Sequence, residues 1–254
     1  MGAVAGNVGV RNDGASLLAA VQSLEYVLNI SVGKRLLDMF GQVSCASGAL
    51  AAFRRRALTQ VGGLDVGPGE DLDLTLRLRY AGWKVRFAEK AWCLTDVPQT
   101  PRGFVRQRLR WERDALRLRL RKHRRSLDPR DISASMKELL HQLEFLLTHL
   151  GATLAFPLYL IWLVHNFGSG ALTVLMAVTL VYAGLDVIAV LCALVVVDRA
   201  GLGRLLPYLP LYGPFHAYLL RTIRLIAYVQ EWVFDASRRD RYVPMRVAKK
   251  VPLY

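Results

Sequence analysis

Residues 145–185 have the sequence FLLTHLGATLAFPLYLIWLVHNFGSGALTVLMAVTLVYAGL, a stretch without any Lys, Arg, Asp or Glu. An α-helix needs about 20 apolar residues to cross a lipid bilayer, and this stretch is roughly twice that length. Residues 166–170 combine glycines with polar side chains, which favours a short turn. We therefore predict a hairpin of two membrane helices, over residues 145–165 and 171–197.

A third apolar segment, residues 205–234, is interrupted by three prolines and by Arg221 and Arg224. If it crossed the membrane fully, the basic tail at residues 235–254 would lie opposite the basic N-terminal half, against the positive-inside rule. A re-entrant or interfacial path would keep the tail on the same side. We favour a third crossing because the segment is long, and we predict a transmembrane region over residues 145–234.

The 254-residue chain carries 34 Lys and Arg against 20 Asp and Glu, and 53% of its residues are hydrophobic. This composition excludes a disordered tail and a disulfide scaffold. Because 23 of the basic residues lie in residues 1–132, the positive-inside rule predicts that the N-terminal half lies in the cytoplasm. With the apolar segments above, we predict a multi-pass protein of the plasma membrane. Cys45, Cys93 and Cys192 have no metal-like spacing, and we predict unpaired, reduced thiols.

The N-terminal half alternates between strand and helix patterns. Residues 2–10 are small and β-prone, and residues 83–93 alternate like a strand. Residues 16–30 and 72–80 have apolar side chains at helical spacing, with Ser16 as the expected N-cap of the first helix. We predict an α/β fold over residues 1–125, followed by an interfacial amphipathic linker over residues 126–144.

Residues 102–125 form a basic amphipathic helix with eleven Lys and Arg against Glu112 and Asp114. A basic stripe with interleaved aromatic residues can bind nucleic acid. The helix directly precedes a membrane region, however, and an anionic leaflet attracts such a helix by about 1 kcal/mol per basic residue. We therefore predict a phosphate or a membrane surface as its partner, and not nucleic acid.

Three carboxylates, Glu70, Asp71 and Asp73, lie where a glycine-rich loop meets the helix at residues 72–80. Acidic residues in a first helical turn can simply complement the helix dipole, which stabilises by up to about 1 kcal/mol. A carboxylate at such a loop edge can also act as a general base toward a hydroxyl group. The sequence alone leaves both interpretations open.

A second polar cluster, Gln107, Arg108, Arg110 and Trp111, lies on the basic helix. An Arg side chain offers a fork of donors to a phosphate, and a Trp offers a flat surface on which a sugar ring can stack. The alternative is an ordinary basic helix with one Trp that faces the membrane.

These clusters, in this order and before membrane helices, resemble the membrane-embedded family 2 glycosyltransferases, the inverting enzymes that include cellulose, chitin and hyaluronan synthases. The resemblance rests on an ordered set of motifs at residues 4–8, 47–49, 53–55, 62–64, 70–74, 77–78, 81–83, 95–98 and 107–111. It implies a partial GT-A-like domain at residues 1–125 and inverting transfer from a nucleotide sugar, with a UDP-sugar favoured, to a hydroxyl of a glycan or lipid-linked acceptor.

The resemblance also implies residue roles. Asp71 corresponds to the catalytic base of the family, and Glu70 to its acidic neighbour. Gln107, Arg110 and Trp111 match the Q-x-x-R-W motif, which holds the nucleotide diphosphate and the acceptor end. Ser47 and Gly48 correspond to the turn that binds the acceptor in the family, so the resemblance implies that they bind substrate too.

Two departures from the family pattern stand out. The family places a metal-binding D-x-D and a uridine-binding acidic residue before the segment that resembles residues 4–10, and this sequence has no residues there. The Mg²⁺ or Mn²⁺ that the family implies therefore lacks evident ligands. Asp114 stands where many relatives have a small residue. We expect the C-terminal part of such an enzyme, with a separate donor-binding half as a possible partner. The alternative is a membrane subunit that binds acceptor or partner without turnover.

One charged residue, Asp186, lies within the apolar segment at residues 171–197. A bare carboxylate at the centre of a bilayer costs about 2.5–3.5 kcal/mol on insertion scales, so it normally faces a partner or water. From helix rise and sequence distance, we predict an ion pair between Asp186 and Arg221 or Arg224. The alternative is a protonated Asp186 between helices.

Overall fold

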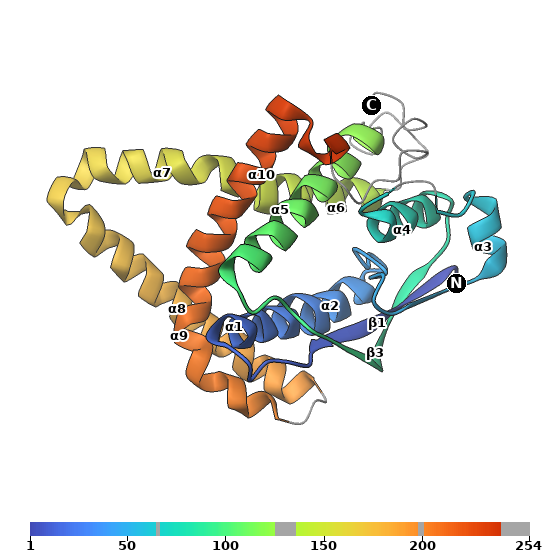
Figure 1. Cartoon of the computed structure of the whole chain (residues 1–254), viewed down its shortest axis with the longest axis horizontal. Coiled ribbons are helices and arrows are strands. Elements are labelled where there is room, and N and C mark those ends of the chain that lie inside the picture. Colours follow the sequence, from blue (N-terminus) through green and yellow to red (C-terminus); the bar gives the residue numbers. More distant parts are fainter. Residues whose placement is uncertain (65–66, 125–135, 198–200, 240–254) are drawn as a thin grey trace.

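The computed structural model describes residues 1–64, 67–124, 136–197 and 201–239 (Figure 1). Its small mixed sheet has the strand order β2-β1-β3, with β1 (Ala3–Val10), β2 (Ala51–Phe53) and β3 (Val85–Thr95). Strand β1 pairs antiparallel with β2 and parallel with β3, so that Ala3 faces both Phe53 and Val85. The strands predicted from residues 2–10 and 83–93 are confirmed, although most of the described chain is helical.

The predicted helix at residues 16–30 is also confirmed. It consists of α1 (Leu17–Tyr26), a π-helical turn η1 (Val27–Val32) and α2 (Gly33–Met39), and the Ser16 hydroxyl accepts the Ala19 N–H at 3.1 Å as its N-cap. The short helix α3 (Arg55–Gln60) follows β2. Helix α4 (Glu70–Tyr80) begins two residues before the predicted start, which brings Glu70 and Asp71 into its first turn.

The basic helix is α5 (Pro101–Arg117) with its continuation η2 (Leu118–Lys122). Five of its cations contact partners inside the protein: Arg108 with Glu25, Arg117 with Asp114, Arg119 with Gln142, Arg121 with Asp235, and Lys122 with Asp73. The expectation that the stripe faces phosphates or lipid is therefore wrong for these five side chains, because carboxylate or amide groups of the protein bind them, four on other segments and Asp114 on α5 itself. Arg102, Arg106 and Arg124 remain exposed.

Helix α6 (Met136–Phe145) lies in the region predicted as a linker. The region of the predicted apolar hairpin follows as η4 (Leu146–Gly151), α7 (Ala152–Phe167), η5 (Gly168–Gly170) and α8 (Ala171–Val196). Figure 1 shows α7 leading away to a tip, from which α8 returns. Gly168 has a φ of +49° at this tip, which confirms the predicted turn. The helical stretch Glu138–Val196 is long and apolar enough to cross a membrane.

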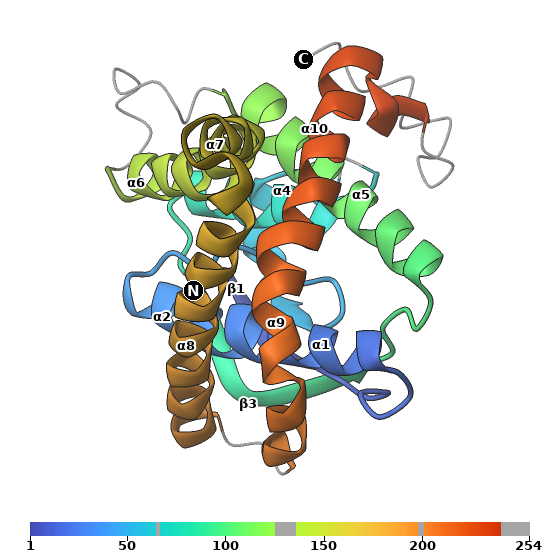
Figure 2. The ribbon, with the colours of Figure 1, turned by 90° about the vertical axis from the view of Figure 1, so that its left-hand side faces the viewer.

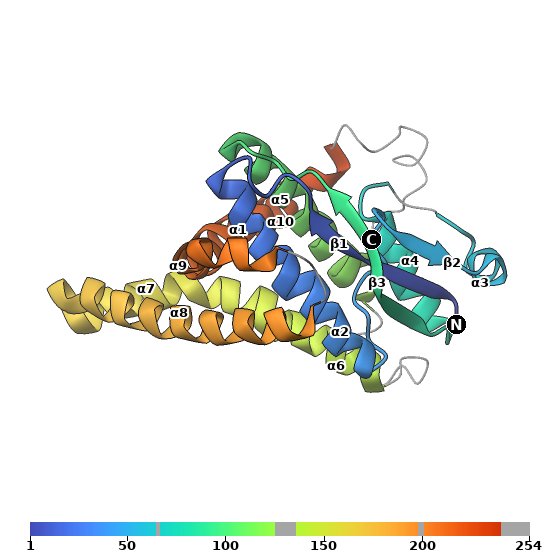
Figure 3. The same ribbon diagram turned by 90° about the horizontal axis from the view of Figure 1, so that it is seen from below.

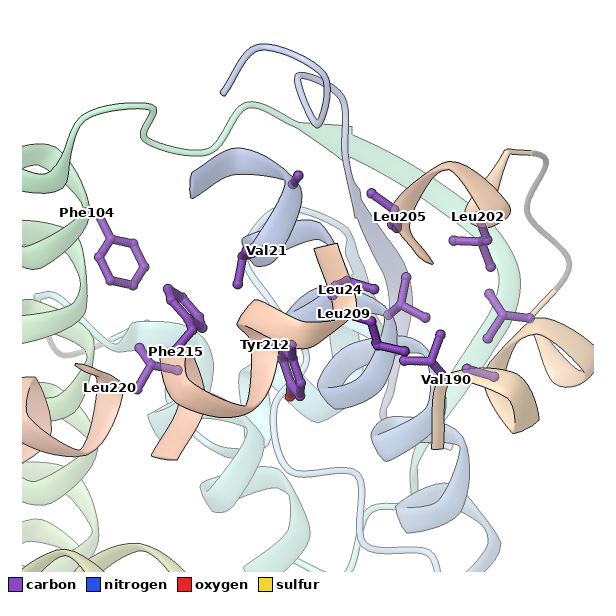
Figure 4. Packing of buried hydrophobic residues seen from close by; sticks show 14 of the residues in the cluster. Val21, Leu24, Phe104, Val190, Leu202, Leu205, Leu209, Tyr212, Phe215 and Leu220 are labelled. Carbon is purple, nitrogen blue, oxygen red and sulfur yellow. The ribbon is translucent and has the colours of Figure 1, made fainter. Parts of the chain in front are cut away.

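The C-terminal segment consists of η6 (Leu202–Tyr208), α9 (Leu209–Pro214), η7 (Phe215–Leu220), α10 (Arg221–Phe234) and η8 (Ala236–Arg239). Figure 2 shows α9 and α10 following one another past α1 and α5. Figure 4 shows the main buried cluster, in which Tyr212 of α9 and Val190 of α8 lie with Leu24 of α1 and Phe104 of α5. Whether residues 205–234 cross a membrane stays a prediction.

The predicted ion pair of Asp186 is wrong. Arg224 forms an ion pair with Glu112 of α5, with 3.0 Å between Nε and Oε2, and the Arg221 guanidinium lies 5.2 Å from the centre of the Phe156 ring. Within the described residues, Asp186 forms no ion pair; its carboxylate instead lies 3.1 Å from where a Cβ at Gly213 would stand. Helix depth alone could not reveal that α5 supplies a carboxylate for Arg224.

Two predicted regions lie largely outside the described residues. The linker predicted at residues 126–144 is described from residue 136, where α6 begins, and the basic tail predicted at residues 235–254 is described to residue 239. The three cysteines are free thiols, as predicted. Figure 3 shows how the sheet and α4 lie at one end of the molecule and the tip between α7 and α8 at the other.

Candidate active site

A cavity of about 790 Å³ lies between the start of α4, the turn at residues 47–49, α1 and α5. The three predicted site segments, residues 47–48, 70–71 and 107–111, are far apart in the sequence and meet at this cavity. All seven predicted site residues line it: Ser47, Gly48, Glu70, Asp71, Gln107, Arg110 and Trp111. The fold thus assembles the acidic cluster, the small-residue turn and the aromatic-basic cluster into one concave site.

Asp71 is held by two backbone donors at the edge of this cavity. The Gly48 N–H donates to Oδ2 at 3.0 Å, and the Leu72 N–H donates to Oδ1 at 2.8 Å. The Thr75 hydroxyl donates to the Asp71 carbonyl at 2.7 Å and accepts the Ala46 N–H at 2.8 Å, which fixes the start of α4 against the turn. The Asp71 carboxylate therefore has a defined orientation at the cavity that it lines.

Glu70 and Asp71 both lie next to the same small residue, Gly48, at the cavity. A Cβ on Gly48 would lie 3.7 Å from Glu70 Oε1 and 3.8 Å from Asp71 Oδ2, so a side chain there would fill the space before both carboxylates. Both acids also lie in the first turn of α4, where the helix dipole stabilises negative charge. The dipole effect and a chemical role are therefore compatible.

Ser47 receives a hydrogen bond from a buried cation that the sequence reasoning missed. Lys34 of α2 is 5% exposed, and its Nζ donates to Ser47 Oγ at 2.5 Å. Burial lowers the pKa of Lys34, whereas the negative charge of nearby Asp71 opposes this shift. Lys34 thus fixes the turn that in turn orients Asp71.

Gly69 allows α4 and α5 to approach each other at the cavity. Its φ is +84°, and a Cβ there would lie 2.8 Å from Leu118 Cδ1 and 3.2 Å from Asp114 Cβ. Asp114, which departs from the family pattern, therefore packs against this glycine from α5. Arg117 adds a hydrogen bond from Nη2 to the Pro68 carbonyl at 2.7 Å.

We expect Gly69→Ala to lower the free energy of unfolding by about 2–5 kcal/mol, because left-handed backbone strain of about 1–2 kcal/mol adds to overpacking of about 1–3 kcal/mol. Gly82→Ala is the matched control, since Gly82 has a φ of +78° but nothing within 4 Å of its Cβ position. Denaturant unfolding of the two variants separates strain from collision. Equal losses in both would show that α4 and α5 do not meet closely at Gly69.

Asp73 connects the same two helices below the cavity. Its fully buried carboxylate accepts from Arg77 Nε, Lys122 Nζ and His123 Nε2, each at 2.8 Å. Burial by itself would raise the pKa of Asp73, but the hydrogen bonds from His123 and Lys122 outweigh it and hold the pKa well below its ordinary value. Asp73 therefore anchors α4 to the end of η2, and the cavity is lined by Glu70 and Asp71 without it.

The aromatic-basic cluster projects into the cavity from α5. Trp111 is 39% exposed, and the Gln107 Oε1 is a buried acceptor without a hydrogen-bond partner among the described residues. Arg110 lines the cavity with them. A flat apolar ring, an amide acceptor and a guanidinium together suit a ligand with hydroxyl groups, a sugar face and a negative charge.

Two further residues at the cavity wall were not predicted as site residues. Arg108 makes a two-fold ion pair with Glu25 of α1, and both line the cavity. Glu25 is the one charged residue in the mainly apolar segment at residues 16–30. A lone charge in an apolar helix requires a partner when it is buried, and this signal could have identified the pair.

The described residues do not fit a Mg²⁺ or Mn²⁺ site. Within ranges 1–64, 67–124, 136–197 and 201–239 there is no group of three or more His, Cys, Asp or Glu side chains that could hold a metal ion. Both carboxylate oxygens of Asp71 already accept backbone N–H groups.

Comparison with known proteins agrees with the geometry. Residues 1–194 match the family described as Glycosyl transferase family group 2. A poly-beta-1,6-N-acetyl-D-glucosamine synthase of Staphylococcus aureus (strain COL) is 34% identical over 112 residues, which are 44% of this chain and 27% of that protein. A synthase of the same name from Staphylococcus epidermidis is 33% identical over the same shares. The match thus spans about a quarter of the length of these relatives.

Proposed function

This chain belongs to glycosyl transferase family group 2, and we propose that it provides the acceptor side of the active site of an inverting glycosyltransferase. The observation that carries the proposal is the common cavity of residues 47–48, 70–71 and 107–111. These residues supply a base, a sugar-stacking ring and a cation for a leaving diphosphate. The proposed substrates are a nucleotide sugar, with a UDP-sugar favoured, and a glycan or lipid-linked acceptor.

In the proposed reaction, Asp71 is the general base. Its carboxylate takes the proton of an acceptor hydroxyl as the hydroxyl oxygen forms a bond to the anomeric carbon of the donor sugar. The bond between that carbon and the nucleoside diphosphate oxygen breaks, and the electron pair leaves on the diphosphate. Attack from the face opposite the leaving group inverts the anomeric configuration.

The remaining residues position the two substrates. Arg110 offsets the negative charge that develops on the diphosphate. The Gln107 amide binds polar groups of the donor next to that diphosphate. Trp111 stacks on the terminal acceptor sugar. Ser47 and Gly48 form the wall beside the acceptor hydroxyl, next to Asp71. Glu70 binds a second hydroxyl of that sugar.

The relatives suggest the sugar. Their name specifies a β-1,6-linked N-acetylglucosamine polymer, and we propose that this chain takes an acceptor of the same chemical class. We also propose that α7 and α8 cross the plasma membrane as a hairpin with the catalytic part in the cytoplasm. Large apolar side chains exposed on these helices, such as Leu158 and Leu180, support this placement.

The second candidate function is an acceptor-binding subunit without turnover. It is favoured by the lack of a metal-ligand cluster among the described residues. Both functions require acceptor binding, whereas only the first requires Asp71-dependent transfer. Transfer assays therefore distinguish them.

Trp111→Ala should weaken binding of a β-1,6-linked N-acetylglucosamine pentamer at least about tenfold, because loss of stacking costs about 1.4 kcal/mol or more. Isothermal titration calorimetry of the purified chain in nanodiscs measures this change. Trp232→Ala is the control, since Trp232 is 51% exposed on α10 and does not line the cavity. If both variants bound the pentamer with equal affinity, the assignment of Trp111 to the acceptor site would be wrong.

A further inference from the structure

We infer that Glu25 is a positioning residue that acts through Arg108 on the Trp111 ring, which is called the acceptor platform below. The inference rests on the proposed function of Trp111 and extends it to a residue of another helix. None of the motifs at residues 70–74 or 107–111 includes Glu25.

The first step is the contact between α1 and α5. Arg108 Nη1 donates to Glu25 Oε1 at 2.7 Å, and Nη2 donates to Oε2 at 2.6 Å. Both side chains are 8% exposed. A planar fork that meets a carboxylate at two points fixes the orientation of the guanidinium as well as its position.

The second step is the contact between Arg108 and the platform. The Arg108 guanidinium lies 4.7 Å from the centre of the Trp111 ring and 5.2 Å from that of Phe104. Phe104 is itself buried and packs on Phe215 at 5.3 Å between ring centres. The guanidinium is therefore held between a fixed ring and a partly exposed one, and a cation on an aromatic face restrains that ring.

The third step concerns what holds Arg108 when Glu25 is absent. Arg108 Nε is buried without a hydrogen-bond partner among the described residues. Within these residues, the hydrogen bonds of the Arg108 guanidinium therefore go to Glu25. An uncompensated buried cation would turn toward the open cavity, which Arg108 already lines. Trp111 would then lose its support from behind.

A neighbouring ion pair provides a matched control. Glu112 of α5 pairs with Arg224 of α10 at 3.0 Å, and these side chains are 17% and 12% exposed. Glu112→Gln removes a largely buried carboxylate from the same helix without removing the cation from the Trp111 ring. The comparison of Glu25→Gln with Glu112→Gln thus separates positioning from general stability.

Two readouts test the inference in the purified chain in nanodiscs. The fluorescence of Trp111 is obtained by subtracting the signal of the same protein with Trp111→Phe. Acrylamide should quench this fluorescence at least about twofold more strongly in Glu25→Gln than in the wild type. In Glu112→Gln the quenching should equal that of the wild type. The dissociation constant of the β-1,6-linked N-acetylglucosamine pentamer should rise about tenfold in Glu25→Gln only, which corresponds to about 1.4 kcal/mol.

The exchange variant Glu25→Arg with Arg108→Glu distinguishes a structural pair from a positioning pair. It restores the ion pair but places a carboxylate behind Trp111. The free energy of unfolding should therefore return toward the wild-type value, whereas the affinity for the pentamer should stay as low as in Glu25→Gln. Recovery of affinity, or equal quenching in Glu25→Gln and wild type, would overturn the inference. If the wild type binds no pentamer while the quenching difference is present, the proposed acceptor site fails and the positioning of Trp111 by Glu25 stands.

Discussion

Asp71→Asn should lower the rate of glycosyl transfer at least about a hundredfold in membranes from cells that express the natural gene, because an amide cannot take the proton of the acceptor hydroxyl. An Asn side chain has nearly the same shape and keeps one oxygen to accept from Gly48 N–H or Leu72 N–H. The fold and acceptor binding should therefore change little. Release of nucleoside diphosphate with the pentamer acceptor measures the rate.

Asp13→Asn is the control for this substitution, since Asp13 does not line the cavity. Its transfer rate should equal that of the wild type. A rate near the wild-type value in Asp71→Asn would exclude Asp71 as the base. Acceptor binding without transfer in the wild type would instead support the non-catalytic candidate.

Asp73→Asn should lower the free energy of unfolding by about 3–5 kcal/mol, the usual cost of removing one partner from a buried ion pair. The carboxylate is fully buried and pairs with Arg77 and Lys122, whose charges would be left without it. Asp96→Asn is the control, because the two side chains of its pair with Arg11 are 50% and 67% exposed. Exposed pairs contribute about 0–1 kcal/mol.

The pH dependence gives a second measurement of the same ion pair. The pKa of Asp73 is depressed in the folded protein, so its stabilisation is present above the ordinary Asp pKa of about 4 and is lost as the pH falls below that value toward the native pKa. Unfolding in urea at pH 7 and pH 3 should therefore show a larger acid loss in the wild type than in Asp73→Asn. Equal acid losses would contradict the anchoring role.

The local patterns predicted from the sequence are those set by neighbouring residues. Strand alternation at residues 83–93, the Ser16 cap and the glycine turn at residues 166–170 depend on side chains within a few positions. The motif residues could also be identified because their types are specific to their chemistry. Their meeting in one cavity was implied by the family resemblance, and the local patterns alone do not contain it.

The features that were missed depend on which helices touch. Glu25 and Arg108 are separated by 83 residues, and no spacing rule relates them. The same holds for Arg224, which was assigned to Asp186 by helix depth but pairs with Glu112. Five cations of the basic helix were assigned to a surface, and four of them have carboxylate or amide partners that lie on other segments. Tertiary contact, rather than local propensity, decides the role of a long charged side chain.

The anomeric configuration of the first product tests the central claim most directly. Membranes from cells that express the natural gene are incubated with UDP-N-acetyl-α-glucosamine and the β-1,6-linked pentamer, and the new linkage is read by NMR. Asp71-dependent transfer by inversion predicts a β-linked hexamer, one released UDP per sugar added, and neither product with Asp71→Asn. An α-linked product, or a β-linked product that forms equally with Asp71→Asn, would contradict it.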